Sequence, residues 1–191
     1  MKKYLLVPFM VLLSLSTAVA QDTKTEEATS ITDRKHEVRL GAVKLLAGPI
    51  FEGVYEYVQD SNRGFGAAVL INFSGSNNEF HEDYSLTPFY RMYFQTKEDY
   101  GAKGFFVEGF TSFFGGKNYT GFYLEDDNGG VSFKENEENF FDISIGLALG
   151  KKWINSAGFV FEIKLGGGRN LLNGSEFEAL FKGDFYIGYR F

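Results

Sequence analysis

The chain has 191 residues, of which 25 are acidic and 19 basic, so its net charge is −6. It contains no cysteine, which excludes disulfides, thiol chemistry and a lipid-anchored lipoprotein. The acidic balance argues against nucleic acid as a partner. The composition is also unusually rich in aromatic residues and glycine, with 22 Phe, 11 Tyr and 23 Gly against 3 Pro.

The first twenty residues have the pattern of a secretory signal peptide. Lys2 and Lys3 precede an apolar run from Tyr4 to about Leu15, and a small-residue site ends at Ala20. The run is shorter than the ~20 residues that a spanning helix needs, so a membrane anchor is the weaker interpretation. We expect cleavage after Ala20, which would leave 17 basic and 25 acidic residues and a net charge of −8.

Residues 21–35 are polar and lack periodicity, so we expect a flexible periplasmic lead-in. Segments with period-two alternation then recur between clusters of Gly, Asn, Asp and Ser, as β-strands and their turns do. Eight such segments are predicted: 36–47, 50–59, 64–73, 84–95, 103–114, 140–153, 158–168 and 179–191. Most approach the ~9–11 residues of a tilted membrane-crossing strand. Residues 36–191 are therefore predicted to form an all-β, eight-stranded, antiparallel, up-and-down transmembrane barrel.

The two faces of these segments differ in kind. In FVFEIKLG, for example, Phe161 and Ile163 alternate with Glu162 and Lys164. Large aromatics occupy the apolar faces and gather near strand ends, whereas the polar faces are glycine-rich and carry both charge signs. This distribution favours lipid outside and a narrow polar lumen inside. A soluble periplasmic barrel that binds an apolar ligand, with its apolar face inward, is the alternative.

The connections support the same topology, with two misfits. With a periplasmic N-terminus, the inside turns DSNRG, TKEDYGA and INSAG are short, and most outside loops are longer. The first outside connection, AGPI, is unexpectedly short. Simple alternation would also place Lys44 on the lipid face, where a bulge or a position near the membrane interface would accommodate it.

Several motifs carry a resemblance to known proteins: TPFYRMYF, GFFVEGF, GLALGKKW, GFVFEIKLGGGRN and YIGYRF. In layout the chain resembles the small OmpA- and OmpX-like outer-membrane barrels, and more closely a family of barrels of unknown function from Bacteroidota. The resemblance covers most of the chain after residue 36. It implies location in the cell outer membrane. It further implies that the last strand is the signal read by the barrel assembly machinery, through Phe185, Ile187, Tyr189 and Phe191.

Charged residues on the polar faces are the candidate site. Ten are expected to point into the lumen: Glu52, Glu56, Arg91, Glu108, Asp142, Glu162, Lys164, Lys182, Asp184 and Arg190. Side chains can fill the interior of an eight-stranded barrel, and buried charges are tolerated when they are paired. We expect a paired polar plug, with Arg91–Glu108 as one pair, and an ion path as the alternative.

The longest outside loop is acidic. It holds Glu125, Asp126, Asp127, Glu135, Glu137 and Glu138 against two lysines. The hairpin-turn signal Asn128-Gly129 lies between its arms, which predicts a protruding ribbon. Because the spacing of the carboxylates matches no EF-hand loop, we expect a solvated surface rather than a calcium site. No metal and no cofactor are predicted.

Catalysis has little support in the sequence. His81, in HEDYS on an outside loop beside Glu82 and Ser85, could act with Asp83 as a rim enzyme on lipid, but no triad is evident. The expected function is a non-enzymatic barrel that displays acidic loops for envelope integrity, adhesion or ligand capture. A narrow pore, the rim enzyme and the soluble ligand-binding barrel stay open, and the extracellular ligand is unknown.

Overall fold

The computed structural model describes residues 31, 33–74, 82–94, 101–125 and 131–191. It describes the backbone but not the side chains of residues 119, 120, 122–125 and 131–135. The expected signal peptide, most of the lead-in and His81 lie outside the described residues.

Eight antiparallel strands close into one barrel in which each strand pairs with its neighbours in sequence and β8 pairs with β1. This confirms the predicted fold class. The strands are β1 (His36–Gly41), β2 (Ile50–Val58), β3 (Arg63–Asn72), β4 (Tyr84–Phe94), β5 (Gly104–Glu125), β6 (Val131–Ile154), β7 (Phe159–Asn170) and β8 (Ala179–Arg190).

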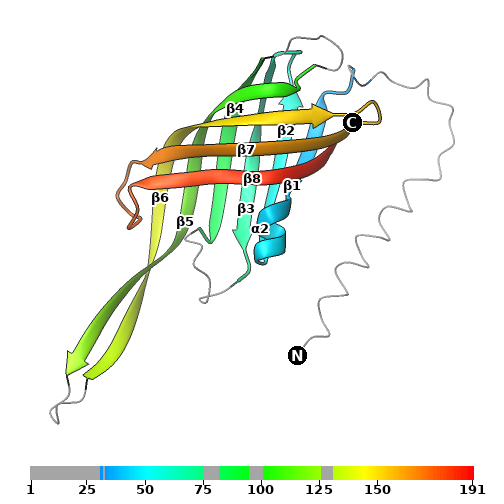
Figure 1. Ribbon diagram of the computed structural model, residues 1–191. Coiled ribbons are helices and arrows are strands. Elements are labelled where there is room, and N and C mark those ends of the chain that lie inside the picture. The colour runs from blue at the N-terminus through cyan, green and yellow to red at the C-terminus, as the bar shows by residue number, and fades with distance from the viewer. Residues whose placement is uncertain (1–30, 32, 75–81, 95–100, 126–130) are drawn as a thin grey trace, which may run out of the picture.

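The barrel has two different ends (Figure 1). We call one the turn end. It holds the first residues of β1 and β3, the last residues of β8 and the short connection between β6 and β7. We call the other the loop end; it holds the connections between β1 and β2, between β3 and β4, and between β7 and β8. There, β5 and β6 continue as a two-stranded ribbon, paired from Gly115↔Phe141 to Glu125↔Val131. The predicted protruding ribbon is therefore confirmed, although its turn, residues 126–130, lies outside the described residues.

The first predicted strand is wrong in its second half. Strand β1 ends at Gly41, and residues Ala42–Ala47 form a short helix, α2. Ala, Leu and Lys are strong helix formers, and the backbone N–H groups of Val43 and Lys44 donate to the Asp184 carboxylate of β8. The helix explains both misfits of the sequence. It lengthens the connection between β1 and β2, and it directs the Lys44 side chain toward Glu52 instead of toward lipid. Among the described residues, no helix is long and apolar enough to cross a bilayer.

Side chains alternate between the outside and the interior along every strand. Ile145, Phe161 and Ile187 point outward and are 55%, 42% and 45% exposed. Their neighbours on the opposite face, such as Ser144 and Glu162, are buried. The apolar face of the strands thus forms the outer surface of the barrel, as the alternation in the sequence predicts.

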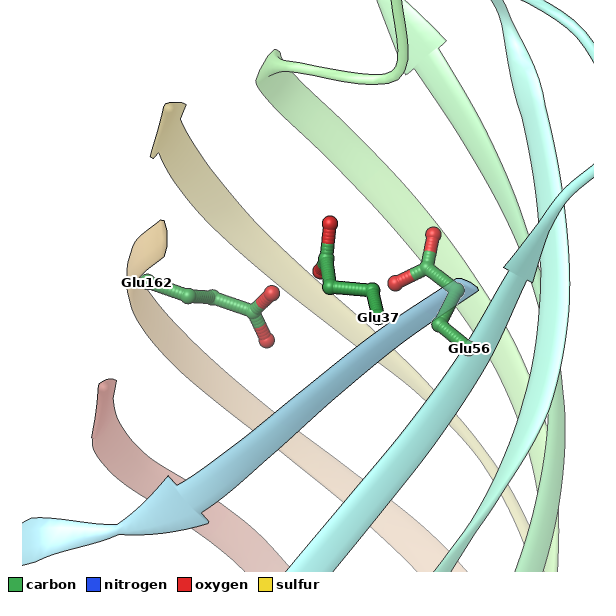
Figure 2. Close-up of side chains that lie close together, drawn as sticks. All are labelled: Glu37, Glu56 and Glu162. Carbon is green, nitrogen blue, oxygen red and sulfur yellow. The ribbon is translucent and has the colours of Figure 1, made fainter. Parts of the chain in front are cut away.

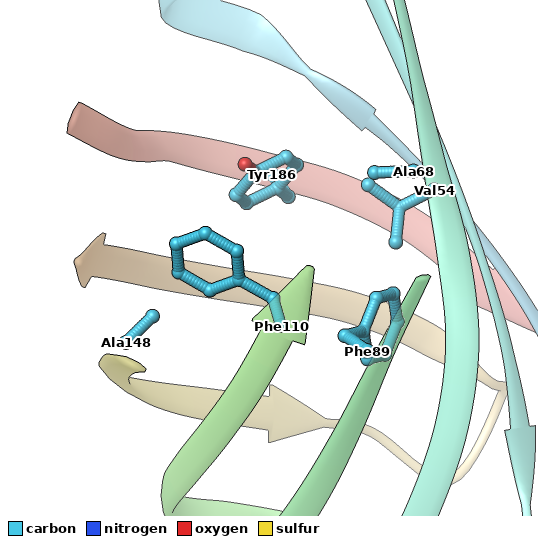
Figure 3. Close-up of a cluster of buried hydrophobic side chains, with 6 residues drawn as sticks. All are labelled: Val54, Ala68, Phe89, Phe110, Ala148 and Tyr186. Carbon is cyan, nitrogen blue, oxygen red and sulfur yellow. The ribbon is translucent and has the colours of Figure 1, made fainter. Parts of the chain in front are cut away.

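The interior holds more aromatic rings than the sequence interpretation allowed. Figure 3 shows Phe89, Phe110 and Tyr186 converging inside the barrel from β4, β5 and β8. Inward glycines make room for such rings. A Cβ on Gly146 would approach the Phe110 ring at 2.5 Å, as well as two backbone atoms of β7. The expected polar lumen is therefore partly an apolar core.

Candidate functional site

The inward side chains are arranged in layers that cross several strands. Counted from the turn end, the inward residues of β4 are an aromatic residue, a charged residue, an apolar residue and a polar residue: Tyr93, Arg91, Phe89 and Thr87. Strands β2 and β5 repeat this order with Val58, Glu56, Val54 and Glu52, and with Phe106, Glu108, Phe110 and Ser112. Because the pattern recurs at matching positions, the second layer brings buried charges together inside the barrel.

We name this charged layer the ionic core. It contains four carboxylates and five cationic side chains, all buried: Glu37, Glu56, Glu108, Glu162, Arg39, Arg91, Lys152, Lys164 and Arg190. Seven of the eight strands contribute a member, and β3 is the exception. Each member contacts at least one opposite charge within 4 Å. The pairs Arg39–Glu162 and Arg91–Glu56 join these contacts into one connected network.

Arg91 is the most connected cation of the ionic core. Its Nε donates to Glu108 at 2.5 Å, and its Nη1 and Nη2 donate to the two Glu162 oxygens at 2.7 and 2.9 Å. Nη1 also reaches Glu56 at 3.0 Å. The guanidinium lies over the rings of Phe89 and Phe106, 4.6 and 4.3 Å from their centres. The pair expected from sequence, Arg91 with Glu108, is present within this larger network.

Three of the carboxylates lie close enough together to resemble a metal site. Figure 2 shows Glu37, Glu56 and Glu162 turned toward one another from β1, β2 and β7. One oxygen of each lies within 4.8 Å of the others. However, Arg39 Nη1 contacts all three groups, at 2.8 Å for both Glu56 and Glu162. A guanidinium nitrogen therefore stands where a metal ion would bind, and the geometry fits an ion-pair cluster rather than a metal centre.

The remaining cations tie the ionic core to its surroundings. Lys152 Nζ lies 3.0 Å from Glu37 and 3.2 Å from Glu56. Arg190 donates from Nε to Glu37 at 3.0 Å, and its other nitrogens donate to the carbonyls of Gly101 and Ala102. Strand β8 thereby fastens the connection between β4 and β5 across the turn end.

Apolar layers enclose the ionic core on both sides. At the turn end, two clusters cover it: Val58, Tyr93, Ala102 and Phe106, and beside them Ile31, Ile154 and Val160. Ile31, from the expected lead-in, is thus packed against the barrel. On the other side lies the cluster in Figure 3: Val54, Ala68, Phe89, Phe110, Ala148 and Tyr186. The buried charges are consequently separated from both mouths by packed apolar side chains.

A second polar layer lies nearer the loop end. Lys182 Nζ donates to Glu82 at 2.7 Å and to Ser85 at 3.1 Å. Glu52 pairs with Lys44 from α2 and accepts a hydrogen bond from the Tyr186 hydroxyl. These contacts attach the helix and the segment before β4 to the inside of the barrel.

Asp142, like Asp184, has backbone groups as partners, in contrast to the carboxylates of the ionic core. Its carboxylate accepts hydrogen bonds from the N–H groups of Leu172, Gly174 and Ser175 at 2.9–3.2 Å. It therefore holds the connection between β7 and β8 against the base of the ribbon.

All ten predicted lumen residues are buried inside the barrel. Six belong to the ionic core, whereas Glu52, Asp142, Lys182 and Asp184 lie toward the loop end. Sequence reasoning did not name Glu37, Arg39 and Lys152, although the outward positions of Val38, Leu40 and Trp153 imply them by alternation. It also placed Glu82 on an exposed loop, and the structure buries it against Lys182.

Three residues of the expected assembly signal lie on β8, which pairs with both β7 and β1, and the fourth, Phe191, directly follows it. Ile187, Tyr189 and Phe191 are exposed on the outer surface, and Phe185 is half-buried there against Phe161. Recognition of this strand by the assembly machinery stays a prediction.

Comparisons with known proteins give a likeness of fold. No family model matches the chain, and no curated protein matches it. Among solved structures, the chain is similar to the N-terminal β-barrel domain of Pseudomonas aeruginosa OprF. The match covers 83% of this chain and 98% of that domain, with 12% sequence identity and a TM-score of 0.46. The strand pairing of the chain itself shows a closed eight-stranded antiparallel barrel.

Proposed function

We propose that the protein is a non-conducting, non-enzymatic barrel of the outer membrane that anchors an acidic ribbon and loops at the cell surface. The observation that carries this proposal is that apolar side chains lie outside and charged side chains inside, the reverse of a water-soluble protein. Large apolar side chains cover the outside, and nine charged side chains form the ionic core.

The apolar outer surface runs around the whole barrel. Every strand contributes at least one large, exposed apolar or aromatic residue; one from each strand in order is Val38, Tyr55, Val69, Tyr90, Phe105, Leu147, Ile163 and Ile187. Soluble monomers rarely expose apolar patches of more than a few hundred Å². A continuous ring of such side chains is what contact with lipid acyl chains requires, and a closed barrel leaves no strand edge to solvate.

The filled interior supports an anchor rather than a pore. Ion conduction needs a continuous watery path, and here apolar clusters lie on both sides of the ionic core. Buried charges with several partners each are costly to rearrange. The ionic core therefore supports a structural plug that fixes the relative positions of the strands.

The orientation follows from the usual layout of such barrels, in which turns face the periplasm and loops face outward. The ribbon of β5 and β6 would then extend from the cell surface. Its sequence from Lys117 to Glu138 holds six acidic residues and two lysines. Envelope integrity, adhesion or ligand capture would each use this display. The barrel assembly machinery would read the outer face of β8.

Two measurements test this proposal. Expressed with its first twenty residues in a Gram-negative host, the protein should remain in the outer-membrane pellet and migrate differently in electrophoresis before and after boiling. Purified and placed in a planar lipid bilayer, it should give no stepwise conductance. Release by osmotic shock would support a soluble periplasmic barrel instead, and regular conductance steps would support the pore.

The rim-enzyme alternative depends on His81, which lies outside the described residues. A changed lipid A profile in cells that carry His81→Ala, compared with wild type, would favour it over the anchor.

A further inference from the structure

The barrel wall is incomplete beside β8. Strand β1 pairs with β8 from Glu37↔Arg190 to Gly41↔Tyr186 and with β2 from His36↔Tyr57 to Leu40↔Gly53. Strand β8, however, begins at Ala179. Residues 179–185 therefore have β7 on one side and no β1 residue on the other.

Helix α2 fills this gap. It contacts β8 on one side and β2 on the other, and Figure 1 places it beside β8 toward the loop end. It is fastened from the inside of the barrel. Asp184 accepts hydrogen bonds from the N–H groups of Val43 and Lys44, at 2.9 and 3.3 Å, and the Lys44 ammonium pairs with Glu52.

The outward face of α2 is apolar. Val43, Leu45 and Leu46 are 56%, 51% and 88% exposed, whereas Lys44, the one charged residue of the helix, points inward. A helix that faced water would place its lysine outward and its leucines inward. The arrangement here matches the rest of the barrel, with apolar groups outside and charge inside.

The length of β8 indicates the depth of helix α2 in the bilayer. Phe181 near the loop end and Phe191 at the turn end are ten positions apart in the chain, which matches the ~9–11 residues of one bilayer crossing by a tilted strand. The gap beside 179–185 lies in the loop-end half of that crossing. Because α2 has only 6 residues, most of its backbone polar groups lie at its ends. Asp184 accepts hydrogen bonds from the N–H groups of Val43 and Lys44, and the Gly48 N–H donates to the Lys44 carbonyl.

On the basis of the proposed membrane location and orientation, we propose that α2 is a lipid-contacting part of the barrel wall. Its apolar face, Val43, Leu45 and Leu46, contacts acyl chains of the outer leaflet and closes a lateral gap between β8 and β2. The partner is the hydrocarbon of the bilayer, because the surface continues the outward apolar face of the strands on either side, including Phe51 and Ile187.

The single tryptophan of the chain allows a direct test. In a Trp153→Phe background, Leu46→Trp places the fluorophore on α2, and Phe161→Trp places it on the strand wall as a matched control. Both variants are refolded into phosphatidylcholine vesicles with or without bromine atoms on the acyl chains, and folding is checked by heat-dependent migration. We expect brominated lipid to quench both tryptophans and aqueous acrylamide to quench neither strongly.

The outcomes separate the two proposals. If the Phe161→Trp signal is quenched by brominated lipid but the Leu46→Trp signal responds to acrylamide alone, α2 faces water and the inference is overturned, while the membrane barrel stands. If neither responds to brominated lipid, the proposed function fails as well. Should Leu46→Trp prevent folding, Leu45→Trp carries the same test from the adjacent exposed position.

Discussion

Two ion pairs of equal length lie in contrasting parts of the molecule. In the ionic core, Arg91 Nη1 and Glu162 are 2.7 Å apart, with side chains 0% and 1% exposed. On the ribbon, Lys117 Nζ and Glu137 are also 2.7 Å apart, but their side chains are 34% and 43% exposed. Both are pairs of a basic side chain with a glutamate at the same distance, but one pair is buried and the other is partly exposed to water.

The difference teaches that separation alone does not measure what an ion pair contributes. Water solvates the ribbon charges whether or not they meet, so pairing them changes the free energy of unfolding little. The charges of the ionic core have lost water and depend on one another, so removing one leaves its partners buried and unpaired. Breaking single contacts in each region should expose this contrast.

The largest effect is expected from Arg91→Leu. This change leaves Glu56, Glu108 and Glu162 each without one partner, and loss of one member of a buried pair costs about 3–5 kcal/mol. Urea unfolding in detergent micelles, followed by heat-dependent migration, should show that loss in the free energy of unfolding. Wild-type stability in Arg91→Leu would contradict the network.

A smaller effect is expected from overpacking the interior with Gly146→Ala. The added methyl group would meet the Phe110 ring and the backbone of β7, and overpacking typically costs about 1–3 kcal/mol. The matched control is Gly167→Ala on the next strand, where the nearest atom to the new Cβ is a carbonyl oxygen at 3.7 Å. Equal unfolding midpoints for the two variants would show that the glycine is not needed for ring packing.

The smallest effect is expected from Lys117→Met on the ribbon. An exposed pair contributes about 0–1 kcal/mol, and salt screens it. The free energy of unfolding should change by no more than that amount, and the change should shrink as sodium chloride is added. A loss as large as that of Arg91→Leu would end the contrast between the two regions.

Alternation predicted the directions of most side chains. Once Phe161 and Ile163 were placed outside, Glu162 and Lys164 had to lie inside, since a strand repeats every two residues. The same rule put Arg91 beside Glu108 on strands joined by a hairpin. The number of strands came from the same alternation, the topology was supported by the lengths of the connections, and the ribbon came from the Asn128-Gly129 turn signal.

The parts that could not be predicted depend on contacts between distant segments. Helix α2 replaces a strand because Asp184, more than 130 residues away, binds its first N–H groups. Glu82 lies inside the barrel because it pairs with the buried Lys182 ammonium, 100 residues further along the chain. The convergence of Glu37, Glu56 and Glu162 on Arg39 requires the barrel to close, since β1 meets β7 only through β8.

Aromatic residues were the least informative signal. The sequence interpretation placed most large rings on the apolar, outward faces, although Phe residues occur on both faces of GFFVEGFTSFF. Phe106 and Phe110 are nevertheless inside, next to Gly150 and Gly146 on the paired strand, whose missing side chains provide the space. Residue type alone does not reveal such complementarity between neighbouring strands.

The central claim is that the outward face of the barrel contacts lipid, and native Trp153 tests it without any substitution. Its ring lies on the outer surface near Lys151 at the turn end. In vesicles of bromine-labelled phosphatidylcholine, we predict that its emission is blue-shifted and strongly quenched relative to unlabelled vesicles. An emission maximum typical of water, with quenching by acrylamide and none by brominated lipid, would contradict the account.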